Sequence, residues 1–441
     1  RLWTFIQKDL VPLVEENLTK SLNRPFKLGK VERLSLLGVK FAPSEIPAIP
    51  TNKNRIIMDG LEISFNLWQL LFQHQLNLDI NLVNPDVYIQ QDSQETWLSN
   101  TLATSSRFGL IKIDLDKLRI TNGKLILIPY QANKSDKKAL IANPVSLSQL
   151  NGLAQLQDNN QLIIFQVGGN VGSGGNIDFR GSVHPETSSG NLQIQVKDIF
   201  IPEVSKVLPL PIELQGGRAR GNVKIKLTHK QEALMFGKVA VEGMQIKFPQ
   251  APETFRQSQG NISFQGMTIK LENITTNYGN IPLAAHGIIH RQDGYQLVGK
   301  VRSVELSKAL ESLQFEVPVY VNGKVKADIK VGGAITQPVI SGTVATIIPT
   351  YIDKVNFQDI QSKFKFFTSS GLISIWNLQG KTKLGGKITG DGIMKLDDSP
   401  SFNFRLVANK FPGDSLTQVY NLKLPLKISK FNATALLTGT P

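Results

Sequence analysis

Two histidines are close enough in the sequence to raise the question of a metal site. Of the five histidines, His286 and His290 are four residues apart in "IPLAAHGIIH" (281–290). The alternation around them predicts the end of a strand, where residues i and i+4 share a face about 13 Å apart. One ion cannot bridge that separation, so the pair predicts solvated polar positions and no metal site.

Two other patterns suggest chemistry at first sight. "GGNVGSGGN" (168–176) is glycine-rich like a phosphate-binding loop, but it lacks the Lys–Ser/Thr ending and leads into a strand, which predicts a hairpin or bulge turn. Asp114 and Asp116 alternate with apolar residues, which predicts a solvated strand face and no acid–base pair. No catalytic residue and no cofactor are therefore expected, and the sequence predicts a protein that is not an enzyme.

The charge of the chain permits two classes of partner. The formal net charge is +14, and the basic residues are spread along the sequence. Nucleic acid and an anionic membrane surface both attract such a chain. The lysines of "GKVKADIK" (323–330) alternate with apolar residues and have no aromatic stacking platform beside them, so nucleic acid is not expected.

Most of the sequence has the period of a strand. In "GKVKADIKVGG" (323–333) apolar and polar residues alternate, and the pattern recurs in "NLQIQVK", "GNVKIKL", "YQLVGKVR", "FNFRLV" and "LIKIDLDKLRI". One long helix is predicted at residues 2–22, interrupted by Pro12. The sequence begins with Arg1 and has no apolar run of about 18 residues. We therefore expect neither a signal peptide nor a spanning helix in it, and an anchor removed before residue 1.

A repeat of about 105 residues organises these strands. Pro211, Pro318 and Pro425 recur at equal intervals, and each follows a short helical pattern, "EVSKVL", "LSKALESL" or "DSLTQVYNL". An alternating strand follows each proline. Three glycine motifs open the units: "GGNIDFRGSV" (174–183), "GNIPLAAHGII" (279–289) and "GGKITGDGIM" (385–394). The third unit is cut short at Pro441, so the native protein is expected to be longer.

Alternating strands are compatible with two architectures. In a β-sandwich, the apolar faces of two sheets close against each other. In a single sheet curled into a trough, the apolar face remains open as a groove, which soluble proteins rarely expose without a ligand. Aromatic residues make up only 7% of the chain and the strand interiors are apolar on one face, which is compatible with the trough. Alternating strands more often belong to a sandwich, however, so the pattern alone favours a sandwich or solenoid.

A resemblance to a known family changes this preference and favours the trough. The order of "GKVERLSLLGVKF" (29–41), "DGLEISFNLWQLLF" (59–72), "LDINLVNPDVYIQQD" (78–92) and Trp97 resembles the N-terminal part of the AsmA-like superfamily, specifically TamB. "GGAITQPVISG" (332–342) is similar to the joint between TamB repeats, through Gly333, Pro338 and Gly342. The first unit lacks that proline. These motifs are most similar to those of the cyanobacterial and plastid relatives of TamB, which include an inner-envelope translocon component.

The resemblance implies a fold and a function. The implied fold is a mostly β chain, an elongated repetitive sheet curled into a trough, with an N-terminal helix and one short helix per repeat. The implied function is lipid transfer, in which a hydrophobic groove conducts phospholipid or glycolipid acyl chains between inner and outer membranes. The implied location is the periplasm or intermembrane space, anchored in the inner membrane and spanning the envelope. The alternative is a scaffold that assists barrel assembly or protein translocation with an Omp85-type partner.

The repeat predicts both segments and lining residues. The expected segments are an amphipathic helix (1–24), an AsmA-like β segment (25–167), two groove repeats (168–278 and 279–384) and a truncated third repeat (385–441). Gln193, Gln195, Lys224, Lys300, Lys326 and Lys330 are expected to face outward. The predicted lipid-binding lining consists of Leu192, Ile194, Val196, Val223, Ile225, Leu227, Leu297, Val301, Val325, Ala327, Ile329, Val331, Phe402, Phe404 and Leu406.

Overall fold

The structure is a computed structural model of the chain, and it contains two compact units. Unit 1 comprises residues 1–210 and 218–239, and unit 2 comprises residues 211–217 and 240–441. The described residues are Pro12, Glu15, Glu16, Thr19, 24–35, 37–50, 52–66, 68–69, 72, 75–91, 106–108, 111–131, 140–141, 144–158, 161–207, 213–248, 251–315, 319–396, 401–423, 425 and 428–439. The predicted helix at 2–22 lies almost entirely outside these residues.

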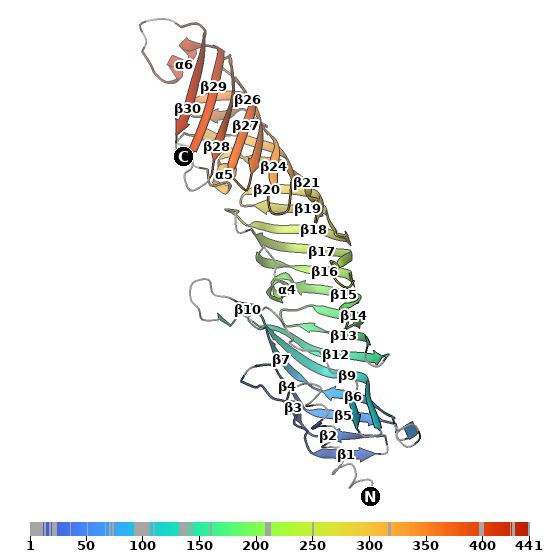
Figure 1. Cartoon of the computed structure of the whole chain (residues 1–441). Coiled ribbons are helices and arrows are strands. Elements are labelled where there is room, and N and C mark those ends of the chain that lie inside the picture. Colours follow the sequence, from blue (N-terminus) through green and yellow to red (C-terminus); the bar gives the residue numbers. More distant parts are fainter. Residues whose placement is uncertain are drawn as a thin grey trace. The chain divides into compact units, whose positions relative to one another are not determined.

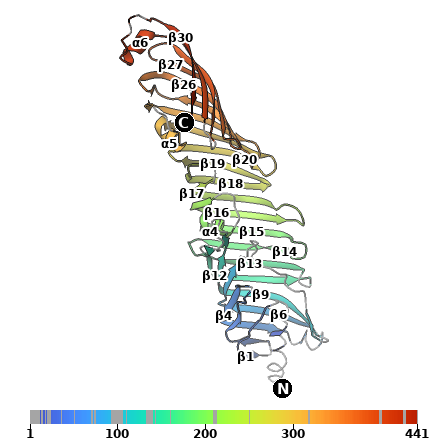
Figure 2. The same cartoon turned by 60° about the vertical axis from the view of Figure 1, so that its left-hand side comes forward.

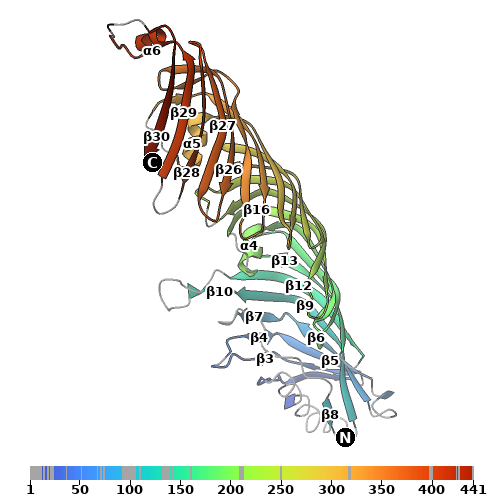
Figure 3. The same ribbon diagram turned by 45° about the horizontal axis from the view of Figure 1, so that its top comes forward.

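The first part of unit 1 is a branched, mixed sheet. Its antiparallel strands follow the order β1 (Val31–Ser35), β2 (Gly38–Phe41), β5 (Gly60–Phe65) and β6 (Gln75–Val83). The long strand β9 (Ile111–Ile128) runs parallel to β6 and then to β7 (Asp86–Gln90), as Figure 3 shows. Strands β3 (Ser44–Ile46) and β4 (Arg55–Met58) extend the sheet from β7, and β8 (Ser106–Phe108) pairs with the start of β9.

The rest of unit 1 is an antiparallel meander that starts on β9. It runs through β12 (Val145–Gln157), β13 (Leu162–Val171), β14 (Asn176–His184) and β15 (Ser189–Phe200) to β16 (Glu213–Leu227). The short strands β10 (Tyr130–Gln131) and β11 (Leu140–Ile141) form a separate pair. The predicted turn in "GGNVGSGGN" is confirmed, because it joins the hairpin strands β13 and β14, with Gly174 and Gly175 at positive φ.

Unit 2 is also an antiparallel meander of long strands (Figure 1). Strand β17 (Leu234–Lys247) contributes to both units. The long strands that follow are β18 (Phe255–Gly266), β19 (Thr268–Tyr278), β20 (Ile281–His290), β21 (Gly294–Glu305), β23 (Lys324–Gly332), β24 (Val339–Thr346), β26 (Val355–Phe367), β27 (Leu372–Thr382), β28 (Lys387–Lys395), β29 (Ser401–Phe411) and β30 (Phe431–Gly439). The short strands β22 (Val321–Asn322) and β25 (Thr350–Ile352) pair with each other, and β25 also pairs with the start of β26. Each predicted strand segment coincides with a strand of the structure; Gly323 and Gly333, at the ends of one segment, lie outside β23, and Leu110 lies outside the described residues.

One short helix follows a long strand in each repeat, as the sequence predicts. These are α4 (Ile201–Val207) in unit 1 and α5 (Leu306–Ser312) and α6 (Gly413–Val419) in unit 2. Within unit 2, α6 lies beside the start of β30 in Figure 2. The predicted class, a mostly β chain with an open, curled sheet and short helices, is confirmed. The domain boundaries remain predictions.

β-Bulges explain part of the curl. Asn273 and Asn377 occupy matching strands of the repeat, and both have left-handed backbone conformations with φ of 52° and 54°. The register of β19 with β20 and of β27 with β28 shifts at these residues. A bulge bends its strand and increases the local twist, and asparagine tolerates the left-handed conformation better than most residues. The recurring asparagine therefore marks a recurring bend.

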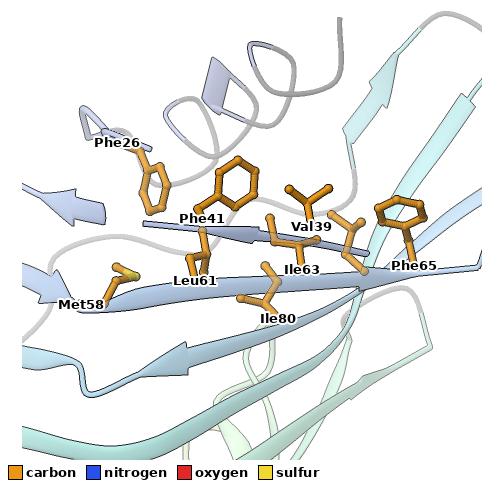
Figure 4. Close-up of a cluster of buried hydrophobic side chains, with 9 residues drawn as sticks. Phe26, Val39, Phe41, Met58, Leu61, Ile63, Phe65 and Ile80 are labelled. Atoms are coloured by element: carbon orange, nitrogen blue, oxygen red, sulfur yellow. The ribbon is translucent and has the colours of Figure 1, made fainter. Parts of the chain in front are cut away.

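The tightest core lies in the first part of unit 1. Phe41, Leu61 and Ile63 on neighbouring strands are at most 3% exposed, and Phe26 closes the cluster from the segment before β1 (Figure 4). In unit 2, Val301, Val304 and Val325 are buried beneath Ala309 of α5. Large buried clusters therefore form where a segment or a short helix covers the apolar face.

A hydrogen bond tethers α6 to the sheet, and we expect Tyr420→Phe to weaken it. The Tyr420 hydroxyl donates to the Asp353 carboxyl at 2.6 Å, and this bond, together with burial, raises the pKa of Tyr420. The substitution should lower the free energy of unfolding by about 1 kcal/mol at neutral pH. The pKa of Tyr420 is higher in the folded protein than its value of about 10 in the unfolded chain. The stabilisation is therefore fully present below about pH 10 and is lost as the pH rises through the folded pKa.

Urea denaturation of the wild type and Tyr420→Phe at neutral pH and above about pH 10 tests this expectation. The difference between the two proteins should shrink at the higher pH. Tyr351→Phe, at an exposed side chain in β25, is the control and should leave the midpoint unchanged. A constant difference across the pH range would show that the phenol does not titrate with folding.

Candidate functional site

The candidate site is the apolar face of the sheet, and it is most extensive in unit 2. Directly paired residues on neighbouring antiparallel strands share a face, so the registers join them into rows. One row crosses from β18 to β30 and is made entirely of apolar residues and glycine: Ile262, Leu271, Gly287, Leu297, Val331, Ile340, Phe366, Ile373, Met394, Phe402 and Gly439. At about 4.8 Å per strand, it extends roughly 50 Å along the sheet.

A second apolar row runs beside the first. It passes through Ala285, Gly299, Ile329, Gly342, Phe364, Ile375, Gly392, Phe404 and Leu437. Neither row contains a charged or hydrogen-bonding side chain. Together the two rows form a continuous apolar strip across nine strands, from β20 to β30.

The strip explains the glycine motifs. The last glycine of each motif, Gly181, Gly287 or Gly392, pairs with a large apolar residue on the next strand. At Gly392 that residue is Phe404, and its ring occupies the space where a side chain on Gly392 would start. Gly342 stands in the same way beside Phe364. At these two positions, glycine lets a phenylalanine ring lie across the neighbouring strand.

Unit 1 has a corresponding face on its meander. Leu192 pairs with Ile225, and Ile194 pairs with Val223. The next strands add the residues that continue these two rows: Phe165, Val167, Phe179 and Gly181. The six predicted lining residues of unit 1 thus lie on one face of β15 and β16.

Most of the predicted lining residues are half-buried. Only Val301 and Val325 are as buried as core residues, with 4% and 8% exposure, because α5 covers them. The other thirteen, including Ile225, Ile329 and Phe404, retain intermediate exposure. A second sheet packed against this face would bury them fully. Among the described residues, the strip is therefore an apolar face left partly open.

The predicted outward residues lie on the opposite face. Gln193 pairs with Lys224, and Lys300 pairs with Asp328. Lys330 lies in the row of Val298, Ser341 and Lys365. The two faces of the sheet in each unit therefore differ sharply in polarity, as the alternation in the sequence predicts.

The fold does not assemble a metal site or an acid–base pair from the histidines and aspartates that the sequence singles out. His286 is exposed beside Val298, whereas His290 Nδ1 lies 3.0 Å from Asp293 Oδ2 and 3.2 Å from the Asp293 amide nitrogen. Asp116 lies 3.7 Å from Lys117, and the side chain of Asp114 is outside the described residues. Within the described part of the chain, no group of three or more His, Asp or Glu side chains is placed to hold a metal ion.

Sequence reasoning missed part of the strip. Phe364, Phe366, Ile373 and Ile375 lie in the same two rows as the predicted lining, on β26 and β27. The segments "SKFKFF" and "LISIW" that contain them alternate with the period of a strand. Each alternation is broken by two consecutive apolar residues, which hides the face that the side chains share. The glycines were missed for a different reason, because a residue without a side chain carries no polarity signal.

The described part of the chain contains no helix that is both long enough and apolar enough to cross a membrane. No family model matches the sequence, and no solved structure matches it. Two curated proteins are distantly similar. One is Protein TIC236, chloroplastic, of Arabidopsis thaliana, with 23% identity over 64% of this chain. The other is Protein SUBSTANDARD STARCH GRAIN 4, chloroplastic, of Oryza sativa subsp. japonica, with 20% identity over 75% of this chain. The matches span only 14% and 17% of those longer proteins, so this chain is similar to a fraction of two chloroplast proteins.

Proposed function

We propose that the chain is part of a TamB-like lipid-transfer protein whose apolar strip carries the acyl chains of phospholipids or glycolipids. The observation that carries this proposal is the pair of uninterrupted apolar rows in unit 2, which remain half-exposed. An exposed apolar surface of this length is unfavourable in water unless a ligand covers it. The distant similarity to two chloroplast proteins supports a place in an organellar or bacterial envelope.

The geometry suits a ligand that slides. Each methylene group of an acyl chain gains about 0.8 kcal/mol when it leaves water for an apolar surface. Because the strip has the same polarity from strand to strand, a chain that moves by one strand exchanges one apolar contact for another. The side chains in the rows offer no hydrogen bonds that would select a headgroup, so affinity should depend on chain length. No reaction is needed, and the proposed protein is not an enzyme.

Native mass spectrometry of the purified 441-residue chain tests the proposal. We expect adducts whose masses correspond to phospholipids or glycolipids, and we expect their occupancy to increase with acyl-chain length when defined lipids are added. A chain that purifies without lipid and takes up none from mixed micelles would contradict the proposal.

The rival proposal is a scaffold for barrel assembly or protein translocation with an Omp85-type partner. It rests on the resemblance of the sequence to TamB. It predicts a complex of fixed stoichiometry with a barrel protein, and no dependence on acyl-chain length. Native mass spectra recorded after a purified Omp85-type barrel protein is added therefore distinguish the two proposals, because a lipid adduct has a far smaller mass than a protein complex.

A further inference from the structure

The three most exposed large apolar side chains of the described residues lie in the first part of unit 1. Leu37 is 74% exposed, Phe72 is 72% exposed and Trp68 is 70% exposed. Other exposed apolar residues are scattered over the two units. Three such side chains at one place in the fold form an unfavourable surface in water, so their surroundings suggest what covers them.

Hydrogen bonds bring the segments of these residues together. The Phe65 amide donates to the Leu37 carbonyl at 3.0 Å, so the turn between β1 and β2 lies beside the end of β5. The chain then enters a short helical turn, where the Trp68 amide donates to Asn66 Oδ1 at 3.0 Å. The rings of Trp68 and Phe72 stack with centroids 5.5 Å apart and planes 7° apart. We call Leu37, Trp68 and Phe72 the aromatic cluster.

The charge around the aromatic cluster identifies the kind of partner. The segments 34–38 (LSLLG) and 65–72 (FNLWQLLF) contain no charged residue. The charged side chains on the strands behind them include Arg33, which directly precedes the first segment, and Lys40, which lies 3.8 Å from Glu32 and 3.9 Å from Glu62. These two positive and two negative charges balance, so the surface offers no net charge to a charged protein or nucleic acid. An uncharged apolar surface that carries tryptophan matches the interface of a lipid bilayer, where indole rings concentrate.

We propose that the aromatic cluster inserts into the surface of a lipid bilayer and docks this end of unit 1 on a membrane. Leu37 and Phe72 enter the acyl region, and the Trp68 indole lies at headgroup depth. Because Arg33 and Lys40 are balanced by Glu32 and Glu62, docking depends on apolar burial more than on anionic lipid. This inference goes beyond the proposed function, since it concerns attachment to a bilayer and not the passage of single lipids along the strip.

Fluorescence of a chain whose only tryptophan is Trp68 tests the docking. Replacing Trp3, Trp97 and Trp376 with phenylalanine leaves this single reporter. On neutral phosphatidylcholine vesicles, we expect a blue shift of the emission and quenching by lipids brominated on the acyl chain. An emission spectrum that is unchanged by vesicles would overturn the proposal.

Flotation with the same vesicles measures the contribution of the cluster. The triple variant Leu37→Ser, Trp68→Ser, Phe72→Ser should lose vesicle binding by about tenfold or more. The matched control is Tyr320→Ser, Leu422→Ser, Leu436→Ser, which removes three side chains of 62%, 56% and 66% exposure elsewhere in the chain. The control should bind like the wild type, and equal losses in both variants would overturn the proposal.

Further measurements separate this inference from lipid transfer and from a protein partner. Circular dichroism melting should be unchanged in both triple variants, because all six side chains are exposed. The cluster variant should also retain its lipid adducts in native mass spectrometry, since the strip is intact. Vesicle binding that persists in the cluster variant at wild-type strength would show that the cluster does not contact a bilayer.

Discussion

Ile329→Asp is expected to abolish lipid contact along the strip of unit 2 while leaving the fold intact. Ile329 lies in the second apolar row between Gly299 and Gly342, and it is half-buried. Water can therefore reach the new carboxylate, and the cost to the free energy of unfolding should remain at about 1 to 2 kcal/mol. An acyl chain that crosses this row must remove that water, which costs a few kcal/mol.

Photo-crosslinkers at Leu297 and Phe404, which lie on either side of Ile329 in strand order, provide the measurement. The yield of lipid adducts should fall about tenfold or more at both positions, because a penalty of 1.4 kcal/mol already corresponds to a factor of about ten. Ser341→Asp is the control on the opposite face, where Lys330 and Lys365 are the neighbouring partners. It introduces the same charge and should leave the adducts unchanged.

A comparison with a closed core makes the prediction stricter. Ile63 is 3% exposed in the buried cluster of unit 1, so Ile63→Asp should reduce the free energy of unfolding by more than about 4 kcal/mol. Circular dichroism melting of the two aspartate variants should therefore differ greatly. If Ile329→Asp melts as early as Ile63→Asp, the strip is a closed core and not a lipid path.

Gly287→Ala is expected to destabilise unit 2 strongly, although it adds one methyl group. Gly287 is the second glycine of the motif "GNIPLAAHGII", and its backbone has φ of 134°, a region that residues with a side chain rarely adopt. A Cβ there would overlap the carbonyl oxygen of Gln296 on the paired strand β21. Backbone strain and the loss of strand pairing together should reduce the free energy of unfolding by about 2 to 4 kcal/mol.

Urea denaturation with hydrogen exchange on β20 and β21 would check this expectation. Gly332→Ala is the matched control in the same unit, because the nearest atom to its Cβ would be the Tyr295 carbonyl oxygen at 3.7 Å. That variant should change the free energy of unfolding by no more than about 0.5 kcal/mol. Similar midpoints for the two variants would show that the positive φ of Gly287 does not require a glycine.

The local structure of this protein follows from its sequence alone. The alternation in "GKVKADIKVGG" determines which residues of β23 share a face, because successive side chains of a strand point to opposite sides. The interval between Pro211, Pro318 and Pro425 likewise locates α4, α5 and α6, because each helix occupies the same place in its repeat. These features depend on residues that are close in the sequence, so the period of the sequence is enough to predict them.

Features that depend on strand pairing were decided only by the tertiary structure. The register places Phe404 across Gly392 and joins Phe364 and Ile375 to the row of Ile329, and no pattern within a single strand specifies its partner's position. The same holds for Val301 and Val325, which alternate like the other lining residues but lie beneath α5. Leu37 lies in a different segment from Trp68 and Phe72, and only the folding of β1, β2 and β5 brings the two segments together. The sequence determined which side chains are apolar and which face they share, whereas long-range pairing decided which of them remain exposed.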